Sequence, residues 1–151
     1  MPRPRGGDWI EDELKAWRSA GVDVVVSLLT PDEIAELDLT GEEKQSAANG
    51  VEYRNLPIAD RGVPTSKAAF LKLATNIAAD FAAGKNVAVH CRQGLGRAPL
   101  VAIVVLVLLG SDLDAATAAV RDARGCPVPE TTEQKRWIAD LVRDLPIAAP
   151  K

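Results

Sequence analysis

The chain has 151 residues, of which 47% are hydrophobic and 26% are charged, and its formal net charge is −3. That length and composition fit one globular domain and exclude a disordered chain. The acidic balance argues against a broad surface for nucleic acid or anionic lipid, so we expect neither as a partner. Two cysteines in unlike contexts do not form a disulfide framework, and we therefore expect a cytoplasmic location.

The sequence shows no segment that would direct the chain to a membrane. Arg3 and Arg5 near the N-terminus are not followed by an apolar run, so no signal peptide is expected. The stretch 99–109 is apolar throughout, but it is shorter than the roughly 20 residues that cross a bilayer. We expect this stretch to form a buried helix, and we expect no membrane partner.

The first fifty residues predict helices around one buried strand. Residues 1–7 are rich in proline, arginine and glycine and are expected to be irregular, and a helix over 8–20 follows. The run 22–29 is β-branched and almost wholly apolar, which is typical of a strand covered on both faces. The sequence Thr30-Pro31-Asp32-Glu33 favours a helix start, and a further short helix is expected over 40–50.

The rest of the chain continues this alternation. A second strand is expected over 51–56, and a loop over 58–65, where aspartate, glycine and proline gather. Apolar residues at helical spacing, the last of them Phe81, predict a helix over 66–83. A third strand is expected over 86–90. Three further helices are predicted, over 97–109, 113–124 and 132–144.

The alternation of helices with buried strands predicts an α/β fold, with a mostly parallel central sheet and helices on both faces. We expect a single domain over 1–151, with an irregular N-terminal segment over 1–7. In such sheets, ligands bind at the carboxyl ends of the strands. Asp60 and Cys91 each follow a predicted strand, so the pattern places them at one crevice.

The segment from His90 to Arg97 carries the strongest chemical signal. A loop between Cys91 and Arg97, at the start of a helix, can point successive backbone N–H groups inward and form a cradle for an anion. Gly94 and Gly96 permit positive φ and a close approach of the backbone to that anion. The same N–H groups favour the reactive thiolate of Cys91. The guanidinium of Arg97 offers a planar fork to two phosphate oxygens.

Three further residues bear on this chemistry. A covalent phosphocysteine route requires a proton donor for the leaving oxygen, and Asp60 is the candidate, although an aspartate in such a loop is also common turn chemistry. His90 is the single histidine, and we assign it to hydrogen bonding that holds the loop and favours the thiolate. Cys126 is interpreted as structural or incidental.

The order His90-Cys91, five residues, then Arg97 resembles the signature of the protein tyrosine phosphatases. Two further segments, 56–60 and 130–134, look like the corresponding parts of the small dual-specificity phosphatases. The resemblance extends over 22–145. It implies the three-layer fold of the cysteine-dependent phosphatases.

The resemblance also implies a role for each matching residue. Cys91 is implied as the nucleophile, Arg97 as the phosphate clamp, and Asp60 as the general acid and then the general base. The backbone N–H groups implied to bind the phosphoryl oxygens belong to Arg92, Gln93, Gly94, Leu95, Gly96 and Arg97. Gln134 is implied to position the attacking water, although a glutamine at a helix start also serves as a cap. No metal and no organic cofactor is implied.

The implied substrates are phosphoproteins or phosphopeptides, and the loop is expected to hold phosphate-like anions. Phosphotyrosine is the expected substrate. No insertion would deepen the pocket for phosphotyrosine alone, which leaves phosphoserine and phosphothreonine open. Phosphoinositide-directed relatives tend to carry lysines inside the loop, whereas Arg92 is the only extra cation there in this chain.

Two departures from the family pattern qualify these expectations. Ala98 stands where most members have a serine or threonine whose hydroxyl bonds the thiolate, so we expect slow breakdown of the phosphocysteine. The phosphatases of regenerating liver share this alanine but carry a prenylation box, whereas this chain ends in Ala149-Pro150-Lys151. In addition, one or two strands normally precede the segment that resembles residues 2–8, so we expect either a smaller sheet or a start within a longer chain.

Three other interpretations stay open on the sequence. Rhodanese-type sulfurtransferases use a similar cysteine loop, but it is typically one residue shorter, and Asp60 would have no role. Arsenate reductases of the low-molecular-weight phosphatase type share the spacing but place it near the N-terminus and use resolving cysteines, for which Cys126 is the only candidate. The third is a slow, substrate-trapping binding module, marked by Ala98, that acts mainly through a protein partner.

Overall fold

A small parallel sheet lies at the centre of the protein in the computed structural model, which describes residues 1–146. β1 (Val24–Ser27) is the middle strand, between β2 (Glu52–Asn55) and β3 (Val87–His90). Both neighbours run parallel to β1, so the carboxyl ends of all three strands meet at one edge. The predicted parallel sheet is confirmed, and three strands make it up among the described residues.

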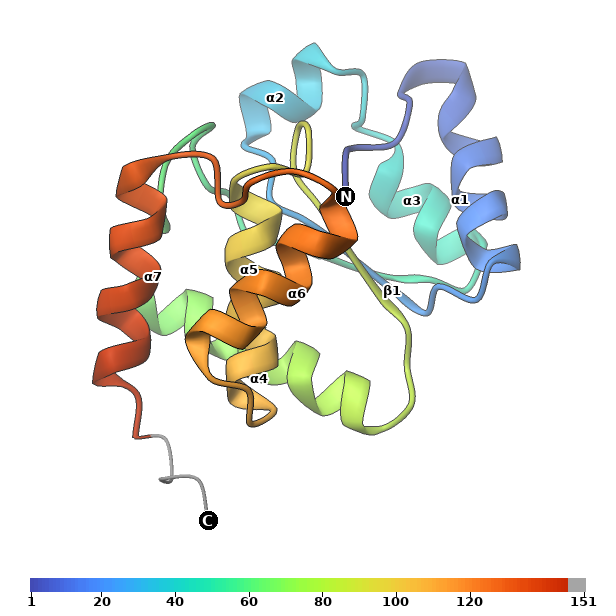
Figure 1. Cartoon of the computed structure of the whole chain (residues 1–151). Helices are drawn as coiled ribbons and strands as arrows, with labels where there is room; N and C mark the ends of the chain where they lie inside the picture. The colour runs from blue at the N-terminus through green and yellow to red at the C-terminus, as the bar shows by residue number, and fades with distance from the viewer. Residues whose placement is uncertain (147–151) are drawn as a thin grey trace.

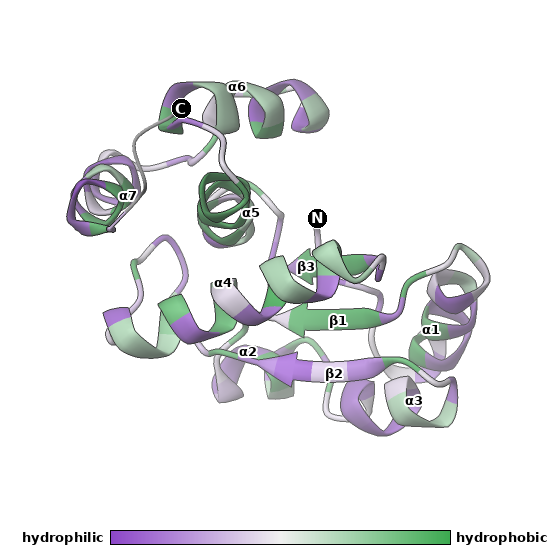
Figure 2. Cartoon of the chain, turned by 90° about the horizontal axis from the view of Figure 1, so that it is seen from below, coloured by the Kyte–Doolittle hydropathy of each residue, from purple (hydrophilic) through white to green (hydrophobic). Residues whose placement is uncertain are grey.

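Helices form the layers on either side of this sheet (Figures 1 and 2). They are η1 (Gly7–Trp9), α1 (Ile10–Ser19), α2 (Pro31–Glu36), α3 (Glu42–Ala48), α4 (Lys67–Ala82), α5 (Arg97–Leu108), α6 (Leu113–Arg124) and α7 (Thr132–Asp144). On one side, α1 and α3 pack together and α3 contacts β2. On the other side, α4 and α5 contact β3, and α6 and α7 pack on α5. The predicted α/β fold with helices on both faces is confirmed.

The main core lies between the sheet and α5. This helix is apolar around its whole circumference (Figure 2), which is typical of a helix enclosed by other layers. Val24 and Val26 of β1 belong to the same core. Phe70 of α4 meets Trp137 of α7 edge to face, with 4.9 Å between ring centroids, and so joins α7 to the core. The packing therefore holds the first turn of α5 close to the end of β3.

Most predicted helix bounds are confirmed, because the caps act as expected. Thr30 forms a capping box at the start of α2, and Ser66 caps α4. α1 begins at Ile10 and α3 at Glu42, so the expected starts at 8 and 40 are each two residues early. The strands are shorter than predicted, because flanking apolar residues such as Leu29 are buried without belonging to the ladder.

Phe81 departs from its predicted place on the apolar face of α4, since its side chain is 60% exposed. The last turn of α4 lies at the rim of the core, beside Leu109, which follows α5 and is 41% exposed. The irregular N-terminal segment ends at residue 6, because η1 begins at Gly7. Within 1–146, no helix has both the length and the apolar character that a bilayer crossing needs. Positions 147–151, which end the predicted domain 1–151 and include Ala149-Pro150-Lys151, lie outside the described residues.

Candidate active site

The loop that follows Cys91 joins the end of β3 to the start of α5. Cys91 is buried, and its Sγ accepts a hydrogen bond from the backbone N–H of Gly94 at 3.2 Å. Gly94 has a φ of +76°, as predicted, and a Cβ there would lie 2.5 Å from the carbonyl carbon of Met1. Gly96 has a φ of −121°, so its role is to provide space: a Cβ there would lie 2.7 Å from Nε2 of Gln134.

Arg97, the first residue of α5, is held by groups from two other segments. Its side chain is 1% exposed. Nη1 donates to Oε2 of Glu33 at 2.7 Å and to the carbonyl oxygen of Ile58 at 2.8 Å. Nη2 donates to Oε1 of Glu33 and to Oδ1 of Asp60, both at 2.9 Å. A guanidinium has five N–H groups, so among the described residues only the N–H on Nε has no partner.

Asp60 and Arg97 are thus in direct contact, and Asp60 lies with Cys91 at the one crevice that the sequence predicted. Asp60 is 49% exposed on the loop after β2. A phosphoryl group that binds Nε and Nη2 side by side would take the place of Oδ1 on Nη2. The Asp60 carboxylate therefore occupies a donor that a phosphate oxygen would use.

Glu33 of α2 is a site residue that the sequence indicated only as part of a helix start. Its carboxylate closes the capping box with Thr30 and binds both Nη atoms of Arg97. Burial raises the pKa of Glu33, but its bonds to Arg97 and Thr30 outweigh burial and lower that pKa below the usual value. Burial would also lower the pKa of Arg97, but the bond to Glu33 and the charges of Cys91 and Asp60 raise it. The ionised pair holds the guanidinium in one orientation.

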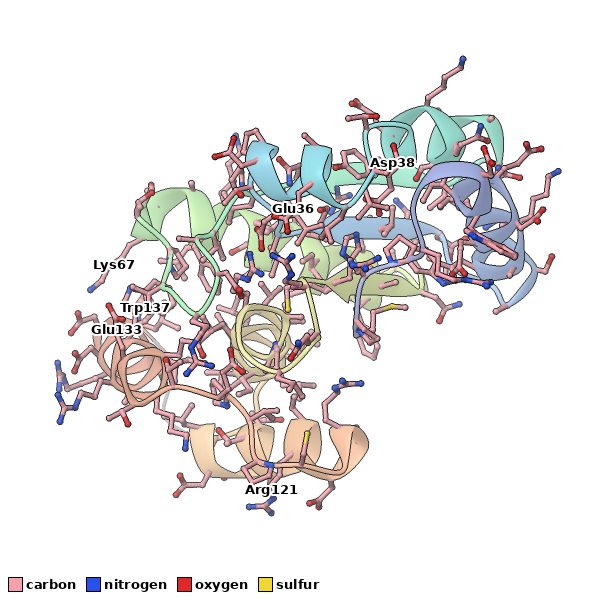
Figure 3. All side chains as sticks on the ribbon, turned by 90° about the horizontal axis from the view of Figure 1, so that it is seen from above. Glu36, Asp38, Lys67, Arg121, Glu133 and Trp137 are labelled. Atoms are coloured by element: carbon pink, nitrogen blue, oxygen red, sulfur yellow. The ribbon has the colours of Figure 1, made fainter. Side chains whose placement is uncertain are left out.

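A cavity of about 130 Å³ opens over Cys91. It is lined by Asp60, Arg61, Cys91, Arg92, Gln93, Leu95, Gly96, Arg97 and Glu130. This volume is well below the roughly 300 Å³ of a typical small-molecule site, so the cavity fits a phosphoryl group and the atoms next to it. Both arginines at its mouth are paired: Arg92 with Glu36 at 2.8 Å, and Arg61 with Glu130 at 3.6 Å. Glu36 lies on the side of α2 that faces this loop (Figure 3).

The carbonyl groups of the loop are held from outside by Arg124, the last residue of α6. Its Nε donates to the carbonyl oxygen of Gly94 at 3.0 Å, and its Nη2 to that of Gln93 at 3.2 Å. Bonds that turn carbonyl groups outward favour a loop whose N–H groups face the cavity. The sequence did not connect Arg124 to this loop.

The three supporting residues that the sequence singled out all lie beside the loop. His90 is fully buried at the end of β3, where its ring contacts Glu42 of α3. Ala98 is buried in the first turn of α5. Gln134 is fully buried at the start of α7, where it forms a capping box and its Nε2 donates to the carbonyl oxygen of Gly62 at 3.0 Å. Gln134 thereby joins α7 to the loop that carries Asp60, and its role with water stays a prediction.

A thiol, a guanidinium and a carboxyl group share this cavity, from Cys91, Arg97 and Asp60. In residues 1–146 there is no cluster of three or more His, Cys, Asp and Glu side chains placed to hold a metal ion. A thiol in a loop at a helix start is suited to nucleophilic attack, and the carboxyl group to proton transfer. The fold and the site together are those of the protein tyrosine phosphatase class.

Similarity to known proteins identifies the family within this class. Residues 1–111 match the family model Tc-R-P, described as "Polymorphic toxin system, DSP-PTPase phosphatase", and the chain belongs to this family. The match includes the three strands, Asp60, the loop after Cys91 and α5, whereas α6 and α7 follow it. No curated protein matches the chain. Family membership favours phosphatase chemistry over the sulfurtransferase and arsenate reductase alternatives.

Solved structures show the same fold. Tk-PTP in its active form is 30% identical to this chain, with a TM-score of 0.77, over 96% of this chain and 89% of that one. Kinase-associated phosphatase, solved with its catalytic-site cysteine replaced by serine, is 19% identical, with a TM-score of 0.82, over 96% and 86%. PTPMT1 in complex with PI(5)P is 19% identical, with a TM-score of 0.76, over 95% and 88%. The last two similarities show the fold alone.

Proposed function

We propose that the protein hydrolyses phosphotyrosine monoesters in phosphoproteins or phosphopeptides through a phosphocysteine intermediate. The observation that carries this proposal is the cavity shared by Cys91, Arg97 and Asp60. In this cavity, Nη2 of Arg97 lies 2.9 Å from Oδ1 of Asp60. Membership of a phosphatase family supports the reaction class. The side chains of the site supply each chemical step.

In the first step, the Cys91 thiolate attacks phosphorus while the bond between phosphorus and the substrate oxygen breaks. The backbone N–H groups of 92–97, with Nε and Nη2 of Arg97, bind the phosphoryl oxygens. Asp60 acts as the acid and donates its proton to the leaving oxygen. Because a protonated carboxyl group binds a guanidinium weakly, protonation of Asp60 also favours its exchange for phosphate on Nη2.

In the second step, the Asp60 carboxylate takes a proton from water, and the water oxygen attacks phosphorus. The bond between phosphorus and Sγ breaks, so Cys91 leaves as a thiolate and inorganic phosphate is released. Gln134 lies against Gly96 and binds Gly62 on the loop of Asp60. From this position Gln134 orients the water once it releases the Gly62 carbonyl.

The charges at the mouth favour a substrate with a single phosphate group. The two arginines there are each paired with a glutamate, so little free positive charge is left for a multiply phosphorylated headgroup. PTPMT1 was solved with PI(5)P, whereas the paired cations of this chain favour a phosphotyrosine peptide. Phosphothreonine and phosphoserine peptides are expected to be slower substrates.

The test measures phosphate release from phosphotyrosine peptides, phosphothreonine peptides and phosphoinositide vesicles at equal phosphate concentration. We expect the highest rate with phosphotyrosine and no turnover by Cys91→Ser. Acid quenching with ³²P-labelled peptide should leave the label on wild-type protein and none on Cys91→Ser. Turnover by Cys91→Ser would exclude the thiol as nucleophile, and a preference for the vesicles would exclude the proposed substrate.

Ala98 favours a second candidate function, a slow phosphatase that traps a phosphoprotein partner. It takes the position of the serine or threonine whose hydroxyl bonds the thiolate in most members of the family, and among the described residues the hydrogen bond to Sγ comes from the Gly94 backbone. Fewer donors make the thiolate a poorer leaving group, which slows hydrolysis of the phosphocysteine. Rapid mixing should then show a burst of one product per site, followed by a slow phase that Ala98→Ser accelerates. A steady rate without a burst would show that the protein turns over its substrate and does not trap it.

A further inference from the structure

A buried carboxylate–imidazole pair lies behind the nucleophile. Oε1 of Glu42, on α3, is 2.6 Å from Nε2 of His90, on β3. The two side chains are 1% and 0% exposed, so solvent does not reach them. Neither residue lines the cavity, and the proposed reaction steps do not use Glu42.

The surroundings of the pair determine how many protons it carries. Nδ1 of His90 faces the carbonyl oxygen of Cys91 at 3.4 Å, and because such an oxygen only accepts, Nδ1 carries a proton. A second proton lies between Nε2 and Oε1, because two lone pairs at 2.6 Å would repel each other. The position of this second proton decides whether the pair is an imidazolium with a carboxylate or two neutral groups.

Basicity favours the charged arrangement. An imidazole is a stronger base than a carboxylate by roughly two pK units, so the shared proton belongs on Nε2 of His90. A carboxylate then remains on Glu42, whose Oε2 has no protein partner among the described residues. The buried carboxylate has the His90 ring as its bonded partner, and the imidazolium compensates its charge.

Other groups around the pair do not compete for this proton. Tyr53 of β2 is the neighbouring titratable side chain, and burial, followed by the charge of Glu42, raises its pKa to about 12, so it stays neutral. Trp17 of α1 packs beside the His90 ring, 6.2 Å between centroids, and carries no charge. On α3, Glu43 is exposed and acts on Tyr53. Cys91 directly follows His90, and its carbonyl oxygen faces the ring of His90.

We propose that Glu42 is a positioning residue that keeps His90 doubly protonated, so that a buried imidazolium stabilises the Cys91 thiolate. A cation beside a thiolate favours the ionised sulfur. The imidazolium supplies part of the stabilisation that a hydroxyl at Ala98 would give. This inference rests on the proposed role of Cys91 as the nucleophile.

NMR tests the protonation state directly, because His90 is the single histidine of the chain. In untagged protein labelled with ¹⁵N-histidine, both ring nitrogens should carry protons at pH 8, where an ordinary histidine has lost one. In Glu42→Gln only Nδ1 should be protonated. Glu43→Gln makes the same change at the next, exposed position and should keep the wild-type spectrum. A neutral ring in wild-type protein overturns the proposal without any variant.

Alkylation tests the link to the nucleophile. The rate of Cys91 modification by iodoacetamide is measured against pH in a Cys126→Ser background, so that a single thiol reacts. Glu42→Gln should move this profile upward by roughly one pH unit, whereas Glu43→Gln should leave it in place. A profile that Glu42→Gln does not shift overturns the proposal.

Neither measurement requires turnover, so a protein that hydrolyses no phosphomonoester would refute the proposed function and leave both outcomes readable.

Discussion

Asp60 has two partners in the proposed reaction, and its protonation decides between them. As a carboxylate it bonds Nη2 of Arg97, whereas as an acid it donates to the leaving oxygen. With a poor leaving group, the rate should therefore fall as pH rises. In Asp60→Asn this falling limb should disappear, and the rate at the optimum should drop roughly 100-fold, as measured by a pH–rate profile.

The leaving group provides the control for Asp60. An aryl phosphate whose phenolate leaves readily needs little help from an acid, so Asp60→Asn should lose less activity with it. If wild type and Asp60→Asn show the same fall in rate with rising pH, measured with the poor leaving group, another residue is responsible for that fall.

Glu33 combines a helix cap with a charge, and the two roles can be separated. Gln at this position keeps the capping box, because glutamine also bonds the N-cap backbone, but it removes the charge that faces Arg97. Glu33→Gln should lower kcat/KM roughly tenfold, since the guanidinium is no longer held in one orientation. The unfolding free energy should fall by about 1–3 kcal/mol, because a buried charged hydrogen bond is weakened.

Asp32→Asn is the matched control for Glu33. It removes a carboxylate from the same turn of α2, but Asp32 is exposed. Steady-state kinetics and urea unfolding should therefore stay close to wild type for Asp32→Asn. Wild-type kcat/KM in Glu33→Gln would show that Arg97 is oriented without its carboxylate partner.

At the scale of helices and strands, local sequence signals were sufficient to predict the elements but not the contacts between them. The starts of α6 and α7 follow from their caps, which lie within three residues of the groups they bond. Cys91 and Arg97 were predictable because one loop carries both. The partners of Glu33, Glu42 and Arg124 lie 64, 48 and 30 residues away, so no sequence spacing links them. One signal was available for Glu33, because it follows β1 at the sheet edge where Asp60 and Cys91 follow β2 and β3.

α6 contributes to the site through its last residue, Arg124. Arg124→Ala removes the two donors that hold the carbonyl groups of Gln93 and Gly94, and kcat/KM should fall roughly tenfold because the loop N–H groups lose their alignment. Arg124→Lys should be intermediate, since a lysine replaces the two-pronged contact by a point charge. Steady-state kinetics measure the loss of kcat/KM, and circular dichroism shows whether the helices remain folded in each variant.

Arg121 provides the control on the same helix. It lies on the outer side of α6, away from the site (Figure 3), and its bond is to the adjacent Asp122. Arg121→Ala should retain wild-type kcat/KM. Equal activity of Arg124→Ala and Arg121→Ala would contradict the assigned role of α6.

At the scale of the whole molecule, ion pairs join the layers and make stability depend on pH. Asp80 of α4 pairs with Arg54 of β2 at 2.7 Å and with Lys85 at 3.1 Å. Burial raises the pKa of Asp80, but these two cations outweigh burial and lower it, and the pKa of Glu33 is lowered in the same way. A carboxyl group whose pKa is lower in the folded state stabilises it above the unfolded value and loses this effect as pH falls through the folded value.

The unfolding free energy should therefore be level near neutral pH and fall below about pH 4.5, as the unfolded chain takes up protons that the folded protein excludes. Asp80→Asn should cost about 1–3 kcal/mol at neutral pH, because Arg54 loses the charge of a partly buried partner. In Asp80→Asn the unfolding free energy should also fall less steeply in acid, since one fewer proton is taken up on unfolding. The curves of wild type and Asp80→Asn therefore converge in acid. Urea unfolding between about pH 3 and pH 7 measures both effects, with the exposed Asp122→Asn as a control that keeps the slope. Parallel curves for wild type and Asp80→Asn would assign the acid sensitivity to other carboxylates, Glu33 first among them.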